Sequence, residues 1–237
     1  MTISTENISD YAFVADAYVK GPVKAVVLSF HGLGYSAMKT VLEQDELEFA
    51  AQGAICVFPY YGPWSWMNRN ARSLTDAVVA AIYEKNRLGE NIPLILRGGS
   101  MGGHAALNFA RYSIRMPAAV ACNCPVTDPK YHAAERADLP RTFLAAYGFE
   151  EQSIDEVYKE NSPFEQAADM PRVPYLIIHG TEDASVNKTA HSDRFVNRMR
   201  EYNHNIEYIE VSGMGHTKFT DHAVYRRYQD FVLEHIV

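Results

Sequence analysis

The chain has 237 residues, of which 47% are hydrophobic and 22% are charged, and its formal net charge is −7. This length suits one well-packed domain, and the composition is that of an ordinary globular protein rather than a disordered, collagen-like or disulfide-rich chain. The negative charge argues against a nucleic-acid partner, because phosphate binding requires clustered Lys and Arg.

The first seven residues lack the basic patch and apolar run of a secretory signal, and no apolar run approaches the length of a membrane helix. The three cysteines, Cys56, Cys122 and Cys124, are too few and too odd in number for a disulfide framework. All three lie in apolar runs, so we expect buried, reduced thiols in a cytoplasmic protein that does not associate with membranes. Cys122 and Cys124 form a CxC pair without evident further ligands, so we expect no metal site.

Short apolar runs alternate with segments of helical periodicity along most of the chain. This alternation predicts an α/β fold with a mostly parallel sheet and helices on both faces. The predicted strands are, in chain order, residues 26–30, 54–58, 92–96, 118–122, 175–178 and 206–211. The predicted helices are residues 41–52, 74–85 with Ser73 as N-cap, 101–112, 187–202 and 223–236. We therefore expect one domain over residues 1–237.

The stretch between Pro125 and Pro174 departs from this alternation. It holds helix-like pieces and scattered prolines but no clear strand over about fifty residues, and structureless loops of that length are uncommon. We therefore expect a helical insertion at about 125–174 that caps the edge of the sheet and precedes the predicted strand 175–178.

The strongest local signal is the segment GGSMGG at 98–103, which lies directly after a predicted strand and before a predicted helix. A G-x-S-x-G sequence in this context is typical of a nucleophile elbow, a strained turn that pushes the serine out of the sheet. Gly-rich turns also bind phosphates, but the sequence has neither GxxxxGK[ST] nor the G-x-G-x-x-G spacing with a well-placed acidic partner. Ser100 is therefore the predicted nucleophile. The Met101 N–H, at the start of the helix, is a predicted oxyanion donor.

Three further motifs accompany the elbow: HGLG at 31–34, IIHGTED at 177–183 and GMGH at 213–216. With them the chain resembles the α/β-hydrolase superfamily, nearest to small esterases and to catalytic domains similar to prolyl oligopeptidase. The resemblance spans residues 23–237, and the motifs follow the order nucleophile, acid, histidine that this fold uses. It implies a serine hydrolase with a triad of Ser100, Asp183 and His216. It also implies a second oxyanion donor, the Leu33 N–H, and a reaction without metal or organic cofactor.

Other residues compete for two of these roles. Asp128 is the alternative acid, because it follows the strand that ends near Cys122 and some hydrolases take their acid from that strand. The alternative bases are His104, His191 and His222. Each lies on a helix-like segment, whereas His216 lies in a Gly-rich loop at the carboxyl edge of the sheet, from which a base can reach the nucleophile.

The segment PYYGPWSWM at 59–67 is unusually aromatic and follows the carboxyl end of a predicted strand. Aromatic walls suit apolar or aromatic acyl and alcohol groups. The predicted substrate-binding residues are Tyr60, Tyr61, Trp64 and Trp66. The alternative is that both tryptophans only pack the insertion onto the sheet. The insertion is expected to supply the rest of the pocket, including Tyr131, Phe143 and Tyr147. Arg69 and Arg72 have two interpretations: they recognise a carboxylate of the substrate, or they are solvated surface residues.

Together these features predict an enzyme that cleaves small to medium carboxylic esters, a small-molecule substrate class, through an acyl-enzyme. The alternative is a peptidase or amidase of the prolyl-oligopeptidase-like type. Such peptidases usually carry a propeller domain, for which we expect no room here, and we find no convincing charged pair for a peptide terminus. A non-hydrolytic protein on the same fold is a third hypothesis, against which the intact triad argues.

Overall fold

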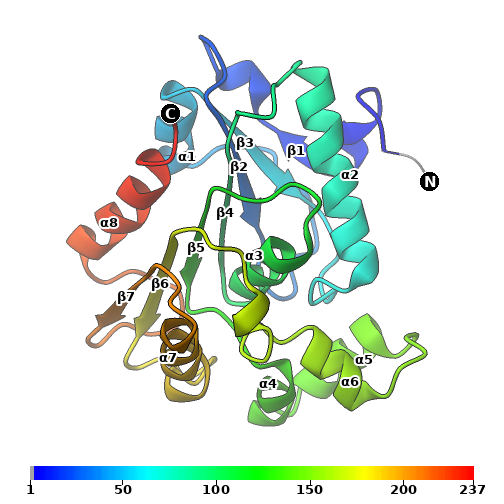
Figure 1. Ribbon diagram of the computed structural model, residues 1–237, viewed down its shortest axis with the longest axis vertical. Coiled ribbons are helices and arrows are strands. Elements are labelled where there is room, and N and C mark those ends of the chain that lie inside the picture. The colour runs from blue at the N-terminus through cyan, green and yellow to red at the C-terminus, as the bar shows by residue number, and fades with distance from the viewer. Residues whose placement is uncertain (1–2) are drawn as a thin grey trace.

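A seven-stranded sheet forms the centre of the computed structural model, which describes residues 3–237 (Figure 1). The strands are β1 (Ala12–Val14), β2 (Ala25–Phe30), β3 (Ala54–Pro59), β4 (Leu94–Gly99), β5 (Ala119–Asn123), β6 (Tyr175–Gly180) and β7 (Ile206–Val211). Their spatial order is β1-β3-β2-β4-β5-β6-β7. All neighbours are parallel except β1, which pairs antiparallel with β3. The predicted mostly parallel sheet is confirmed, and β1 adds an edge strand that the sequence patterns did not predict.

Helices cover both faces of this sheet (Figure 1). They are α1 (Gln44–Ala51), α2 (Arg69–Lys85), α3 (Met101–Tyr112), α7 (Arg194–Glu201) and α8 (His222–Leu233). On one face α2, α3 and α7 bury apolar side chains such as Phe109 and Phe195, and on the other α1 and α8 bury Phe49 and Phe231. Each fully buried side chain of this size contributes about 2–3 kcal/mol to folding through the hydrophobic effect.

The central strands are continuous apolar runs because both of their faces are covered. All six residues of β2 are buried, and their side chains alternate between the two cores. Val26 and Leu28 join the core beneath α2, α3 and α7, while Ala25 and Val27 join the core beneath α1 and α8. Parallel strands with helices on both faces have this sequence character.

The stretch between β5 and β6 is helical, as predicted. It contains α4 (Pro129–Glu135), α5 (Leu139–Tyr147), α6 (Ile154–Glu160) and the short 3-10 helix η3 (Ala167–Asp169). The Asp128 side chain caps α4, and Ser153 and Glu156 form a capping box at the start of α6. Helices α4, α5 and α6 lie together at one end of the molecule (Figure 1).

Helices α1, α2, α7 and α8 all differ from their predicted bounds, and two of these differences have a cause in local capping and backbone geometry. Helix α2 begins at Arg69 rather than at residue 74, since the Asn68 side chain accepts a hydrogen bond from the Ala71 N–H at 3.0 Å. Ser73, the predicted N-cap, therefore lies inside the helix. The predicted helix 187–202 consists of a π-helical turn, η4 (Thr189–Asp193), followed by α7.

Two short 3-10 helices, η1 (Ile8–Asp10) and η2 (Asp16–Tyr18), flank β1. Within residues 3–237, no helix combines the length and the apolar character that crossing a membrane requires.

Candidate active site

Ser100 lies in the sharp turn between β4 and α3. Its φ of 58° and ψ of −126° are values that a residue with a side chain rarely adopts. The Ser100 N–H donates to the Asn123 carbonyl at 3.0 Å, and the Ser100 carbonyl accepts from the His104 N–H at 3.0 Å. The turn is therefore held between the neighbouring strand and the first turn of α3, in the strained form that a nucleophile elbow requires.

The glycines around Ser100 allow backbones to approach one another closely. A Cβ at Gly98 would lie 2.2 Å from the Gly102 carbonyl oxygen, and a Cβ at Gly102 would lie 2.3 Å from the Phe30 carbonyl oxygen. No side chain fits at either position without moving the backbone. These contacts set α3 directly against the ends of β2 and β4, which explains why the motif has glycine at both positions.

Asp183 lies in the loop after β6, and its two carboxylate oxygens have different partners. Oδ1 accepts hydrogen bonds from the backbone N–H groups of Ser185 at 2.8 Å and Val186 at 3.0 Å. Oδ2 accepts from His216 Nδ1 at 2.8 Å and lies 3.2 Å from His179 Nε2. Burial raises the pKa of Asp183, but these hydrogen bonds outweigh it and hold the pKa well below its usual range. The carboxylate is therefore ionised and fixed in orientation.

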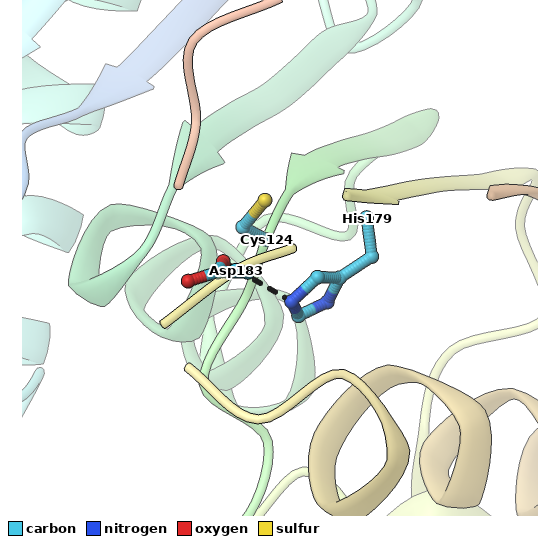
Figure 2. Close-up of side chains that lie close together, drawn as sticks. All are labelled: Cys124, His179 and Asp183. Carbon is cyan, nitrogen blue, oxygen red and sulfur yellow. Dashed lines mark ion pairs between the residues drawn. The ribbon is translucent and has the colours of Figure 1, made fainter. Parts of the chain in front are cut away.

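His179, in β6, supports this carboxylate from within the core. Its Nε2 lies 3.1 Å from the Val186 carbonyl, which can only accept, so Nε2 carries the proton, and its Nδ1 accepts from the Ser192 hydroxyl at 2.7 Å. Figure 2 shows the His179 ring directed towards Asp183, with Cys124 beside them. The three side chains lie close enough to hold a metal ion, but both His179 nitrogens are already committed to hydrogen bonds.

His216 lies in the loop after β7. Because its Nδ1–H donates to Asp183, the neutral ring presents Nε2 as an unprotonated nitrogen that can act as a base. The loop is tied to β5, since Asn123 Nδ2 donates to the Thr217 carbonyl at 2.7 Å and the Thr217 N–H lies 3.5 Å from Cys124 Sγ. Because β5 is the neighbour of β4, these contacts hold His216, which follows the edge strand β7, near Ser100.

Ser100 and His216 line the same open cleft, whose volume is about 640 Å³. Leu33, the predicted oxyanion donor from the loop after β2, lines it as well. Met101 is the first residue of α3, where the initial N–H groups have no acceptor within the helix. The structure thus gathers the predicted nucleophile, base and acid at one edge of the sheet, with the two predicted oxyanion donors next to them.

Of the four predicted substrate-binding aromatics, Trp66 is the one that lines this cleft. Its indole is buried, stacks on Phe143 with 4.2 Å between ring centroids, and donates from Nε1 to the Thr142 hydroxyl at 2.9 Å. The ring therefore packs α5 against the sheet, so the packing interpretation of this tryptophan is confirmed. Its role in substrate binding stays a prediction.

The other three aromatics lie elsewhere. Tyr60 lines an adjoining cavity of about 260 Å³, and Tyr61 and Trp64 line a separate hollow on the surface. Tyr61 is held away from the cleft because its hydroxyl donates to the His31 carbonyl at 2.8 Å and its ring stacks on the His31 ring. For Tyr61 and Trp64 the predicted place in the substrate cleft is therefore not what the structure shows.

The alternative acid and bases have other surroundings. The Asp128 carboxylate accepts from the Tyr131 N–H at the start of α4 and pairs with Arg194 at 3.4 Å. His104 is fully buried between backbone carbonyls, His191 is buried against Glu135, and His222 is exposed at the start of α8. The structure brings together Asp183 and His216, and it does not bring Asp128 to any of the three histidines as an acid–base pair in the cleft.

The insertion contributes two polar residues to the cleft that sequence reasoning missed, His132 in α4 and Arg136 just after it. The three aromatic residues predicted there do not line the cleft: Tyr131 is exposed, and Phe143 and Tyr147 are buried behind Trp66. No sequence signal marks His132, because the side of a seven-residue helix that faces a cleft depends on its packing. Arg69 and Arg72 both pair with Glu160, away from the cleft.

Comparison with known proteins identifies a family and several similar folds. Residues 66–237 match the model of a family described as the prolyl oligopeptidase family. Among solved structures, the chain is similar to a puromycin hydrolase at 23% identity and a TM-score of 0.75, covering 92% of this chain and 34% of the other. It is similar to a puromycin-hydrolyzing peptidase of Mycobacterium tuberculosis at 20% identity and a TM-score of 0.70, covering 90% and 34%.

Similarity also extends to an esterase, esterase B from Lactobacillus Rhamnosis, at 13% identity and a TM-score of 0.71, covering 92% of this chain and 76% of the other. None of the curated proteins matches the sequence. This chain spans about a third of the length of the two puromycin-cleaving proteins. The shared architecture confirms the predicted α/β-hydrolase fold.

Proposed function

This chain belongs to the prolyl oligopeptidase family, and we propose that it is a serine hydrolase that cleaves small to medium carboxylic esters with Ser100, His216 and Asp183 as its triad. One observation carries the proposal. The 2.8 Å hydrogen bond from His216 Nδ1 to Asp183 leaves His216 Nε2 as a base in the cleft that also holds the strained elbow serine.

The reaction follows from these positions. His216 Nε2 takes the Ser100 hydroxyl proton while Ser100 Oγ attacks the substrate carbonyl carbon. The Leu33 and Met101 N–H groups, aided by the positive end of α3, donate hydrogen bonds to the oxyanion that forms. His216 then protonates the leaving group as the carbonyl reforms. Water attacks the resulting acyl-enzyme with His216 again as base, which releases the carboxylic acid and restores Ser100.

Carboxylic esters suit the apolar part of the cleft, where Trp66, Phe30 and Val186 offer contacts to an apolar or aromatic group. A second candidate is cleavage of peptides or other amides. The family match favours it, as do the polar groups of His132 and Arg136 in the cleft wall. His216 could protonate a leaving amine in the same way as a leaving alcohol, so the triad alone serves both substrates.

The test is labelling with a fluorophosphonate probe together with turnover of p-nitrophenyl esters and aminoacyl p-nitroanilides. Three proteins are compared: wild type, Ser100→Ala, and Ser73→Ala as a matched control at an exposed serine of α2. We expect wild type and the control to be labelled and active, and Ser100→Ala to lose labelling and at least ~10³-fold in kcat.

The substrate panel separates the two candidates. Turnover of esters without anilides supports the carboxylesterase, and turnover of anilides supports the peptidase. A wild-type protein that is neither labelled nor active on any of these substrates would show that the triad does not operate as a hydrolase.

A further inference from the structure

A second cluster of histidines and a carboxylate lies in the wall of the same cleft. His132 and Glu135 come from α4, and His191 comes from η4. Glu135 Oε2 accepts hydrogen bonds from His132 Nδ1 and, at 2.9 Å, from His191 Nε2. Its Oε1 accepts from the Asn187 N–H at 3.0 Å. This cluster takes no part in the proposed triad.

The hydrogen bonds around His191 fix where its proton lies. The backbone N–H groups of Thr127 and Asp128 point at its Nδ1 from 3.2 Å and 3.3 Å. A ring nitrogen that faces two donors is the acceptor, so His191 carries its proton on Nε2 and donates it to Glu135. The cluster has the spacing of a metal site, yet both nitrogens of His191 are committed to these hydrogen bonds.

The charge of Glu135 follows from the same contacts. Burial raises its pKa, but the hydrogen bonds from His132 and His191 outweigh burial and lower the pKa to about 2. Glu135 is therefore an ionised carboxylate at neutral pH and can only accept. His132 must accordingly donate to it from Nδ1.

This leaves His132 Nε2 as an acceptor in the cleft. Burial lowers the pKa of His132 despite the hydrogen bond to Glu135, so the ring is neutral at physiological pH. Its edge contacts with the rings of Trp66 and Phe143 fix the ring, which lines the cleft with Ser100. Within residues 3–237, Nε2 has no hydrogen-bond partner, and it is not among the buried polar atoms sealed from solvent.

We propose that His132 Nε2 is a substrate-binding group that accepts a hydrogen bond from an N–H of the substrate. The proposal rests on the hydrolase function proposed above and narrows its substrate class to acylamino esters or amides rather than simple alkyl esters. A bound substrate displaces water from this wall. A substrate with an N–H then satisfies Nε2, whereas one with CH₂ in its place leaves a desolvated acceptor without a partner.

The test compares three substrates with a shared benzyl side chain. The first is the p-nitrophenyl ester of N-acetylphenylalanine, and the second is the same ester with CH₂ in place of the acyl N–H. The third is the p-nitroanilide of the second acyl group, which places an N–H in the leaving group. Comparing each variant with wild type on the same substrate cancels the different intrinsic reactivities of these compounds.

The variants separate the two nitrogens of His132. In His132→Asn the shorter amide reaches about as far as Nδ1, so it keeps a donor to Glu135 and removes the cleft acceptor. In His132→Gln the longer amide places an oxygen near the position of Nε2. His222→Asn makes the same exchange at an exposed histidine outside the cleft and serves as the matched control.

We expect His132→Asn to lower kcat/KM about tenfold or more for at least one N–H substrate and less than about twofold for the CH₂ ester. His132→Gln should restore part of the loss, and His222→Asn should change nothing. The rate of fluorophosphonate labelling depends on Ser100 and His216 and should stay within about twofold of wild type. After kcat/KM for each substrate is divided by the rate of its uncatalysed hydrolysis, wild type itself should prefer at least one N–H substrate to the CH₂ ester, which tests the proposal even if the Asn variant fails to fold.

The role of His132 would be overturned if His132→Asn lost kcat/KM equally on all three substrates, lost labelling in parallel, or lost nothing. Each of these results would leave the hydrolase proposal standing. The absence of a preference in wild type would do the same. A wild type that is not labelled and cleaves none of the substrates would instead overturn the proposed function, and this inference with it.

Discussion

The substitution Asp183→Asn tests the triad sharply, because the structure dictates how the new amide must lie. Backbone N–H groups of Ser185 and Val186 point at the Oδ1 position from 2.8 Å and 3.0 Å. An NH₂ group there would face two donors, so the amide oxygen must take this position. The NH₂ group then takes the Oδ2 position and faces His216 Nδ1 across the present 2.8 Å contact.

An NH₂ group can only donate at that contact, so His216 must accept there and carry its proton on Nε2. In this tautomer Nε2 cannot take the proton of Ser100. Where an orienting aspartate is changed to asparagine in this way, kcat falls about 10⁴-fold, equivalent to about 5.5 kcal/mol of lost transition-state stabilisation. We expect a loss of this order, and a decrease of about 2 kcal/mol in the free energy of unfolding from the weakened hydrogen bonds to His216 and His179.

Steady-state hydrolysis of a p-nitrophenyl ester measures the first quantity, and urea denaturation measures the second. Asp128→Asn is the matched control, since Asp128 is the competing acid and bonds to Tyr131 and Arg194 instead. If Asp183→Asn kept more than about a tenth of the wild-type kcat, Asp183 would not be the residue that orients the base. A comparable loss of kcat in Asp128→Asn would also refute the assignment of Asp183 as the acid, because it would indicate a role for Asp128.

Three further outcomes follow from the structure. Gly98→Ala should lower the free energy of unfolding by about 3 kcal/mol in urea titration, because its Cβ would meet the Gly102 oxygen at 2.2 Å; an unchanged midpoint would contradict that contact. The pKa of Glu135 falls from 4.5 to about 2 on folding, so its stabilisation is complete above about pH 4.5 and is lost as the pH falls towards 2. The stability difference between wild type and Glu135→Gln should shrink over that window, and a constant difference would refute it. Burial raises the pKa of Cys56 and of Cys124 to about 12, so iodoacetamide at about pH 8 should modify no thiol in the native protein and all three cysteines after unfolding, as mass spectrometry would show.

Sequence patterns predict the helices and strands whose formation depends on their own residues and near neighbours in the chain. Strands β2, β3, β5 and β6 are recognisable because both of their faces are buried, which leaves a mostly apolar run. Strand β1 has three residues and no such run, and it is held by distant contacts such as the stacking of Phe13 on Phe58 with 5.9 Å between centroids. The start of α2 depends on the Asn68 cap, which composition alone does not distinguish from a cap at Ser73.

The candidate site likewise contains residues that local motifs predict and residues whose position depends on distant packing. The elbow at Ser100 can be predicted because the spacing of its glycines and its place between a strand and a helix are both visible in the sequence. The acid and the histidine can be predicted because each lies in a recognisable loop after a strand. The remainder of the cleft depends on how the insertion packs, so its prediction from aromatic content favoured Phe143, which lies behind Trp66, over His132, which lines the cleft.

The cleft holds two imidazoles with the same hydrogen bond to a carboxylate, and their burial suits them to different tasks. Both His216 and His132 donate from Nδ1, to Asp183 and Glu135 respectively. A general base must become a cation during the reaction, and the His216 side chain is 26% exposed, so solvent and Asp183 can stabilise that charge. The His132 side chain is only 3% exposed, so a positive charge there is costly. His132 can therefore accept a hydrogen bond without taking the proton. Substitutions in α4 should accordingly change the preference for substrates that carry an N–H, while those in the loops after β6 and β7 should change the rate for every substrate.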